Sequence, residues 1–265
     1  MGPSTPECTK MPYMHASSIE SDVDPLVTFT GVSKRFPDGT TALDGVDLRV
    51  LPGDFVSVVG PSGCGKSTLL RVVSGLTPVT GGTLDVQTGK IGYVFQDPTL
   101  LPWRTVQRNV ELFAELRGLP RDERRRRAAA AIELVGLGEF AGHRPRTLSG
   151  GMRMRVSLAR SLTLQPELFL FDEPFGALDE IARERLNDEL LQLYLTQRFT
   201  ALFVTHSVTE AVFMSTRVLV MSGRPGRVLG DFTVPFTYPR SPRLRFEERF
   251  ARLAGQVSAR LRGAP

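Results

Sequence analysis

One glycine-rich segment constrains the fold more than any other part of the chain. It reads Gly60-Pro61-Ser62-Gly63-Cys64-Gly65-Lys66-Ser67-Thr68. An apolar, β-branched run at residues 54–59 precedes it, and apolar residues at helical spacing (Leu69, Leu70, Val73) follow it. Strand, loop and helix in this order match the phosphate-loop pattern, in which glycines let backbone N–H groups turn inward on phosphates. We therefore predict an α/β core built around a phosphate-binding loop.

The two side chains that end this loop predict how it handles a nucleotide. Lys66 can neutralise charge on the β- and γ-phosphates, and the hydroxyl of Ser67 can ligate Mg²⁺. Cys64 occupies a free position of the motif, where a small residue is tolerated for its size.

Short apolar runs along the chain predict one largely parallel sheet that is covered on both faces. They lie at residues 91–95, 168–171, 201–204 and 218–221. Between the first two, residues 105–117, 121–137 and 151–164 show helical spacing, so we expect a helical lobe at about residues 98–165 inserted into the core. Alternating apolar residues from Leu26 to Val50 predict an N-terminal antiparallel β section. The predicted fold class is thus α/β.

The two ends of the chain are expected to lie outside the ATPase domain, which we place at residues 25–230. Residues 1–24 contain scattered Pro, Ser, Thr and acids with no apolar core, and we predict a disordered leader rather than a signal peptide. Residues 231–265 are Pro-rich and then amphipathic, with apolar residues recurring from Phe246 to Leu261. This helix is predicted to pack on its own domain, while binding to a partner stays open.

The composition of the chain indicates its cellular compartment and the class of partner that it binds. No apolar run approaches the roughly 20 residues that a membrane-spanning helix needs, and two cysteines cannot form a disulfide framework. Both observations favour a cytosolic protein. The net charge of +5 is spread over helical stretches in which acids interleave, which favours a solvated basic face over a nucleic-acid partner and leaves an anionic membrane surface open.

A pair of acids follows the apolar run at residues 168–171. In a protein with a phosphate loop, an acid in this position ligates or orients Mg²⁺, and Asp172 fits that role. Successive residues of a strand point to opposite sides. Glu173 is therefore free to polarise a water molecule.

The segment Leu148-Ser149-Gly150-Gly151-Met152 resembles the signature sequence of the ATPase subunits of ATP-binding-cassette (ABC) transporters. Other elements of that family appear in order over about residues 26–230: Gln96, then Phe175 to Asp179 after the two acids, then His206. The resemblance implies an enzyme that binds ATP and Mg²⁺ and hydrolyses ATP.

The resemblance also implies roles for individual residues. Ser149, Gly150 and Gly151 open a helix and would face the γ-phosphate bound to a second ATPase subunit, identical or different. His206 would contact the γ-phosphate, although a lone histidine after a strand is usually a plain core or surface residue. Phe36 would stack on adenine, with a buried core position as its alternative. Gln96 would contact Mg²⁺ or the attacking water and report nucleotide state to the lobe.

Departures from the family pattern are small. Met152 and Met154 stand where glutamine is common, and neither change removes a phosphate ligand. The loop Leu101-Pro102-Trp103 together with Arg224-Pro225-Gly226-Arg227 resembles importers of the nitrate, sulfonate and taurine group and related thiamine-precursor systems. This implies work at the cytoplasmic face of the membrane beneath a permease, served indirectly by a solute-binding protein.

Two alternatives stay open from the residues alone. Trp103 lies in an apolar, proline-containing loop, residues 97–103, and would be covered either by the lobe or by the permease. A soluble cassette protein acting on nucleic acid is the competing function. Such proteins usually carry long coiled-coil or zinc insertions, and neither a long heptad run nor a cysteine cluster is present.

Overall fold

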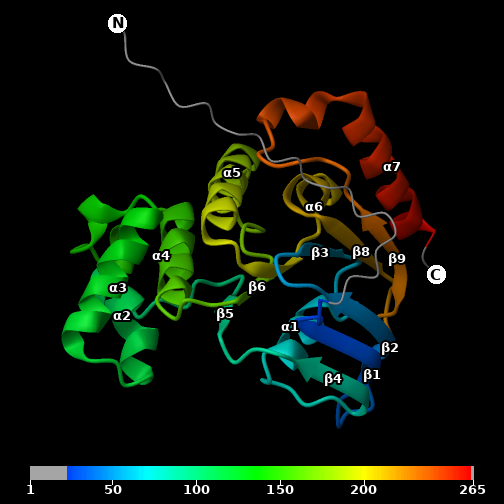
Figure 1. The fold of residues 1–265 in the computed structure, drawn as a ribbon, viewed down its shortest axis with the longest axis horizontal. Helices are drawn as coiled ribbons and strands as arrows, with labels where there is room; N and C mark the ends of the chain where they lie inside the picture. Colours follow the sequence, from blue (N-terminus) through cyan, green and yellow to red (C-terminus); the bar gives the residue numbers. More distant parts are fainter. Residues whose placement is uncertain (1–22, 264–265) are drawn as a thin grey trace, which may run out of the picture.

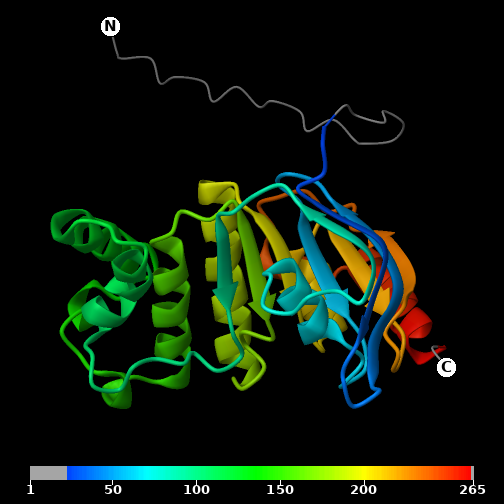
Figure 2. The same cartoon turned by 90° about the horizontal axis from the view of Figure 1, so that it is seen from below.

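The structure, a computed structural model, describes residues 23–263 and contains two β-sheets (Figures 1 and 2). The predicted leader therefore lies almost wholly outside the described residues. The strands are β1 (Val27–Arg35), β2 (Thr41–Val50), β3 (Phe55–Val59), β4 (Gly81–Val86), β5 (Ile91–Val94), β6 (Leu168–Asp172), β7 (Thr200–Val204), β8 (Arg217–Met221) and β9 (Val228–Thr233). The α-helices are α1 (Lys66–Val73), α2 (Val106–Leu116), α3 (Arg121–Leu134), α4 (Gly150–Leu162), α5 (Glu180–Gln197), α6 (Val208–Met214) and α7 (Glu248–Arg262).

The larger sheet has the strand order β5-β6-β7-β3-β8-β9 and is parallel except for β9. Alternate residues of its strands enter two separate cores: Phe55 and Phe203 pack with α5, α6 and α7, whereas Val56 and Leu202 pack with α1 and the smaller sheet. Burial on both faces explains why these strands read as uninterrupted apolar runs. The smaller sheet is antiparallel, with the order β2-β1-β4. The predicted fold class is confirmed.

Helices α2, α3 and α4 pack on one another around a core of their own. This lobe lies between β5 and β6 in the sequence and at the end of the molecule away from the smaller sheet (Figures 1 and 2). Its buried apolar residues are Val106, Val110, Ala128, Ala131, Ile132, Val135, Leu137, Leu148, Val156 and Ala159. A separate core allows the lobe to keep its shape if it turns relative to the sheet.

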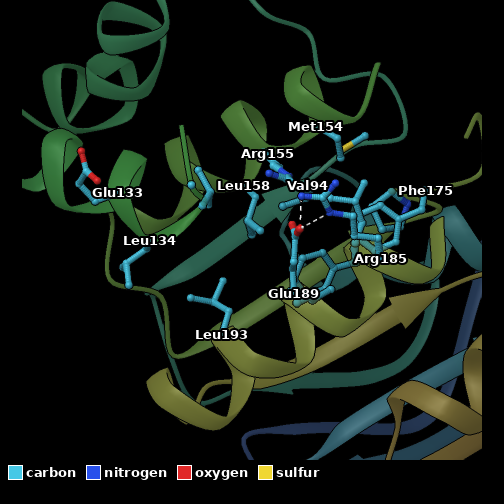
Figure 3. Close-up of a pocket in the computed structure, with 16 residues that line it drawn as sticks. Val94, Glu133, Leu134, Met154, Arg155, Leu158, Phe175, Arg185, Glu189 and Leu193 are labelled. Atoms are coloured by element: carbon cyan, nitrogen blue, oxygen red, sulfur yellow. Dashed lines mark hydrogen bonds and ion pairs between the residues drawn. The ribbon is translucent and has the colours of Figure 1, made fainter. Parts of the chain in front are cut away.

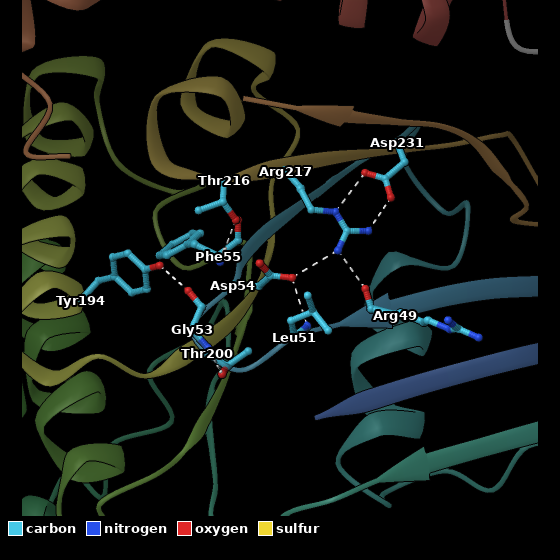
Figure 4. A network of polar contacts seen from close by, with 10 residues as sticks. All are labelled: Arg49, Leu51, Gly53, Asp54, Phe55, Tyr194, Thr200, Thr216, Arg217 and Asp231. Atoms are coloured by element: carbon cyan, nitrogen blue, oxygen red, sulfur yellow. Dashed lines mark hydrogen bonds and ion pairs between the residues drawn. The ribbon is translucent and has the colours of Figure 1, made fainter. Parts of the chain in front are cut away.

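Polar contacts join the amino ends of β3 and β8 to neighbouring elements (Figure 4). Arg217, at the start of β8, donates to Asp231 Oδ2 at 2.5 Å, to Asp54 Oδ2 at 3.2 Å and to the carbonyl of Arg49 at 2.8 Å. The hydroxyl of Tyr194 on α5 donates to the carbonyl of Gly53 at 2.5 Å. Strands β2, β3, β8 and β9 and helix α5 are thus joined at this edge, and the opposite edge carries the loops of the site.

The C-terminal segment packs on its own domain, as predicted. Phe250 and Val257 of α7 are 2% and 0% exposed and join the core beside α6. The prediction for Phe246 was wrong: this residue is 89% exposed and lies in a short 3-10 helix, Pro242–Phe246, because Glu247 is extended and separates it from α7. The boundary predicted after residue 230 falls inside β9, which continues the core sheet. No helix within residues 23–263 is long and apolar enough to cross a membrane.

Candidate active site

The predicted phosphate loop joins β3 to α1 and keeps its backbone open to a ligand. Gly65, the N-cap residue of α1, has φ of 110° and provides no side-chain cap, so the N–H groups of the first turn remain available. A Cβ on Gly65 would lie 2.5 Å from the carbonyl oxygen of Ala42, and only glycine fits there. Pro61, Ser62 and Gly63 are exposed. The loop therefore has open backbone N–H groups, as an anion-binding loop requires.

Lys66 is turned inward, and its side chain is 5% exposed. Its Nζ donates to the carbonyls of Gly60 at 2.9 Å and Pro61 at 3.0 Å, and lies 3.8 Å from Glu173 Oε1. An ammonium with these neighbours is held at the loop, within reach of an incoming phosphate chain. Cys64 is buried, and burial raises the pKa of its thiol.

Asp172 ends β6 and is 7% exposed. Its Oδ1 accepts a 2.7 Å hydrogen bond from the hydroxyl of Ser67, which places the two oxygen atoms side by side. Its Oδ2 accepts from the hydroxyl of Tyr93 at 3.3 Å. Burial and the charge of Asp172 both raise the pKa of Tyr93, so this hydroxyl stays protonated and holds the carboxylate in place. Tyr93 was not predicted, because in the sequence it reads only as a residue of a buried strand.

Glu173 leaves the strand with a positive φ of 46°, unusual for a residue other than glycine. Its N–H donates to the carbonyl of Val204, and its Oε2 lies 3.5 Å from Nδ1 of His206. Because Glu173 follows the last residue of β6, it is this turn, and not the alternation of strand residues, that separates its carboxylate from the buried Asp172. A strained backbone at such a position is typical of functional sites.

His206 is about half exposed and follows β7. The residues that flank it are fixed: Thr205 Oγ1 accepts from the N–H of Ser207 at 3.0 Å and donates to the carboxyl of Glu210, and Ser207 caps α6. Glu210 is 7% exposed, and burial raises its pKa. This carboxyl supports the backbone on both sides of His206. It too was missed, since a glutamate in the first turn of a helix usually reads as a solvated residue.

A cavity of about 380 Å³ brings most of the predicted residues together. It is lined by Phe36, Thr40, Ala42, Ser62, Gly63, Gly65, Lys66, Ser67, Thr68, Gln96, Glu173 and Arg224. Phe36 is half-buried rather than part of a core, and Lys34 Nζ lies 5.3 Å from the centre of its ring. Gln96 is exposed and lies two residues after the end of β5. Arg224 also lines the cavity, although the sequence pattern indicated it only as part of a motif typical of an importer group.

The signature residues lie elsewhere on the chain. Ser149 is exposed and caps α4, accepting a 3.2 Å hydrogen bond from the N–H of Met152. Ser149, Gly150 and Gly151 line a separate hollow with Leu178 and Asp179. They are therefore not brought to the phosphate loop of the same chain.

A third hollow of about 400 Å³ lies where the lobe meets the core, between α4 and α5 (Figure 3). Its floor is apolar and includes Phe171 and Leu190. At its edge Glu189 Oε1 accepts from Arg155 Nη2 at 2.5 Å and from Arg185 Nε at 3.2 Å. The hollow contains none of the predicted site residues. The ion pair between Arg155 and Glu189 joins α4 to α5.

The ABC transporter family matches residues 43–176. The aliphatic sulfonates import ATP-binding protein SsuB 1 of Pseudomonas syringae pv. syringae is 45% identical over 228 residues, which cover 85% of this chain and 92% of the relative. The taurine import ATP-binding protein TauB of Rhizobium johnstonii is 45% identical over 209 residues, covering 76% of this chain and 80% of the relative. The likeness to the sulfonate and taurine group is confirmed.

Solved structures agree with this assignment. The dimeric structure of MJ0796, a bacterial ABC transporter cassette, superposes with a TM-score of 0.70 at 32% identity and covers 80% of this chain and all of the cassette. A dimeric post-hydrolysis state of the same cassette, bound to ADP and Pi, matches equally well. With family, fold and phosphate loop in agreement, the chain belongs to the ABC transporter ATP-binding family and is an ATPase.

Proposed function

We propose that this chain is the ATP-hydrolysing subunit of an importer of small organosulfonates such as aliphatic sulfonates or taurine. The observation that supports this best is 45% identity to SsuB 1 over 85% of the chain. Several candidate residues, among them Lys66, Gln96 and Glu173, line the 380 Å³ cavity. Asp172 and His206 adjoin it through Ser67 and Glu173.

ATP would be held from both ends of the cavity. Residues 60–68 offer backbone N–H groups and the ammonium of Lys66 to the phosphates. Phe36 lines the same cavity, and with Lys34 placed over its ring it keeps an aromatic surface for adenine. Base stacking of this kind contributes about 1–3 kcal/mol.

Mg²⁺ would be held by few protein ligands. Mg²⁺ commonly uses one or two carboxylates, retained waters and substrate phosphates. The 2.7 Å contact between Ser67 Oγ and Asp172 Oδ1 and the position of Gln96 in the cavity fit this requirement. When bound, the metal would neutralise charge that develops on the phosphates.

Glu173 would act as the general base for the attacking water. Its carboxylate lies between Lys66 and His206, at 3.8 and 3.5 Å, and it lines the cavity. His206 would orient that water and contact the γ-phosphate. Gln96 would contact the metal or the attacking water and thereby transmit the nucleotide state to the lobe.

The working unit would be a dimer. Ser149, Gly150 and Gly151 lie outside the phosphate cavity of their own chain, on an exposed helix N-terminus suited to an anion. The cassette MJ0796 is dimeric in its solved structures. In a dimer of this chain, the signature residues of one subunit would close on the phosphates bound by the other.

The permease would contact the loop at residues 97–103, placing the subunit at the cytoplasmic face of the membrane. Trp103 is 68% exposed, so the lobe leaves the indole uncovered. The loop itself is braced: the buried Arg160 donates to the carbonyls of Pro98 and Thr99, and the buried Asn109 donates to that of Leu101. A rigid loop with an exposed indole is suited to a partner surface. A solute-binding protein would deliver the solute to the permease.

The test of the function is the ATPase rate of the assembled complex, reconstituted with its permease and solute-binding protein. Taurine or an alkanesulfonate is expected to raise this rate, whereas nitrate or a thiamine precursor is not. If nitrate alone stimulates the rate, the transported solute is nitrate and not an organosulfonate. Stimulation of the subunit by nucleic acid without a permease would contradict a role in transport.

Trp103→Ala is expected to leave the ATPase rate of the isolated subunit unchanged and to lower solute-stimulated ATPase of the complex by of order ten-fold. Truncating a central aromatic of an interface commonly costs about 2 kcal/mol or more. Leu76→Ala is the control, because Leu76 is 62% exposed but lies outside the lobe. Equal losses of ATPase rate in the isolated subunit and in the complex would show that Trp103 stabilises the subunit itself and does not contact the permease.

A further inference from the structure

A loop far along the chain, which follows β8, is hydrogen-bonded to β2 and lies against the phosphate loop. The N–H of Gly226 donates to the carbonyl of Ala42 at 3.0 Å, and the N–H of Asp44 donates to the carbonyl of Gly226 at 3.1 Å. The contact is close enough that a Cβ on Gly226 would lie 2.2 Å from the carbonyl oxygen of Cys64. The loop that follows β8 is therefore held at a fixed distance from the nucleotide cavity.

The same loop is closed internally by one hydroxyl. Ser222 Oγ donates toward the carbonyl of Pro225 at 2.8 Å and accepts from the N–H of Arg227 at 2.8 Å. Ser222 is buried. This arrangement fixes the point from which the Arg224 side chain leaves the loop.

Arg224 extends from this fixed point along the phosphate loop. Its Nε donates to the carbonyl of Gly63 at 3.2 Å, and its Nη2 would lie 3.2 Å from a Cβ on Gly63. The side chain lines the same cavity as Phe36 and Lys66. A guanidinium thus lies at the cavity wall beside the loop that cradles phosphates.

The charge of Arg224 is not neutralised by the protein. Within residues 23–263 no carboxylate lies within ion-pair distance of it, whereas Arg227 of the same loop pairs with Asp44. The pKa of the exposed Asp38 carboxyl is lowered mainly by its hydrogen bonds with Thr40, with a smaller contribution from the charge of Arg224. Guanidinium groups bind phosphate oxygens through paired N–H donors.

From these contacts we infer that Arg224 is a nucleotide-binding residue that contacts the phosphate chain of ATP. It supplies a cation in addition to Lys66, from a loop outside the phosphate-loop motif. The inference rests on the proposed use of residues 60–68 for ATP, and it adds a binding residue to that site.

The test compares Arg224→Gln with Arg227→Gln, which removes the same charge from the same loop outside the cavity. Affinities of the purified subunit are measured by displacement of a fluorescent trinitrophenyl analogue of ATP with MgATP, MgADP, AMP and inorganic tripolyphosphate. Arg224→Gln is expected to weaken binding of MgATP and of tripolyphosphate about ten-fold, as for loss of one charge-assisted hydrogen bond. Arg224→Lys, which keeps the charge, should recover part of the loss. Arg227→Gln should change affinity less than about two-fold.

Melting temperatures without nucleotide separate binding from bracing of the loop. A binding role leaves the nucleotide-free melting temperature of Arg224→Gln near that of the parent and reduces only the shift caused by MgATP. The inference is overturned if Arg224→Gln and Arg227→Gln have equal effects, if only the nucleotide-free melting temperature falls, or if MgATP binding weakens while tripolyphosphate binding does not. Lys66→Ala tests the underlying site separately: unchanged MgATP affinity in that variant would refute the proposed phosphate loop itself.

Discussion

Glu173→Gln is expected to lower ATP turnover about 10²–10⁴-fold while MgATP affinity stays near that of the parent. A general base contributes a factor of this size, equivalent to roughly 3–5 kcal/mol of barrier. Glutamine keeps the shape of the side chain, and it enters a backbone with φ of 46° that is equally strained for both residues. The measurements are phosphate release and nucleotide affinity of the purified subunit.

The same variant reports on the dimer, because ATP that is not hydrolysed would keep the two subunits closed. In size-exclusion chromatography Glu173→Gln should be dimeric with ATP and monomeric with ADP. The double variant Lys66→Ala with Glu173→Gln should stay monomeric, since it binds ATP poorly. Hydrolysis by Glu173→Gln at near the parent rate would refute the role as base. An inactive variant that remains monomeric at saturating ATP would count against Ser149 to Gly151 as a phosphate clamp between subunits.

The composition of the site could be predicted from the sequence because of the sheet topology. Gln96 and His206 each follow a strand, Asp172 ends one, and the phosphate loop follows another. These four strands, β5, β6, β7 and β3, are neighbours and run parallel. The carboxyl ends of parallel strands meet at one edge, so residues distant in sequence converge there. Only the order of the motifs was needed for this prediction.

The supporting residues could not be predicted, because their partners depend on register and loop placement. Tyr93 reaches Asp172 only because β5 pairs with β6 so that Val94 lies opposite Phe171. Arg224 reaches the phosphate loop through a backbone contact between Gly226 and Ala42. Neither contact leaves a periodic signal in the sequence. The exposure of Trp103 could likewise not be predicted, because the sequence of an apolar loop does not distinguish a loop covered by a partner from one covered by its own domain.

Gly65→Ala is expected to cause the largest structural defect of any single methyl group added to a glycine of residues 60–68. The new Cβ would lie 2.5 Å from the carbonyl oxygen of Ala42 and 3.1 Å from Cδ2 of Leu43, so β2 or the loop must move. The backbone at φ of 110° is also unfavourable for alanine. Together these effects should lower the free energy of unfolding by about 2–5 kcal/mol. Displacement of the loop should weaken MgATP binding by at least about ten-fold.

Gly53→Ala separates the steric clash at Gly65 from the cost of a positive φ. Gly53 has φ of 81°, and no atom lies within 4 Å of the place that a methyl group would take, so alanine there meets only the backbone penalty of about 1 kcal/mol or somewhat more. Denaturant unfolding and nucleotide displacement are measured on both variants. Gly53→Ala should lose some stability and keep the MgATP affinity of the parent, whereas Gly65→Ala should lose both. If Gly65→Ala binds MgATP as tightly as the parent does, the phosphate-binding loop does not need its close contact with β2. The assignment of residues 60–68 as a preorganised site would then have to be abandoned.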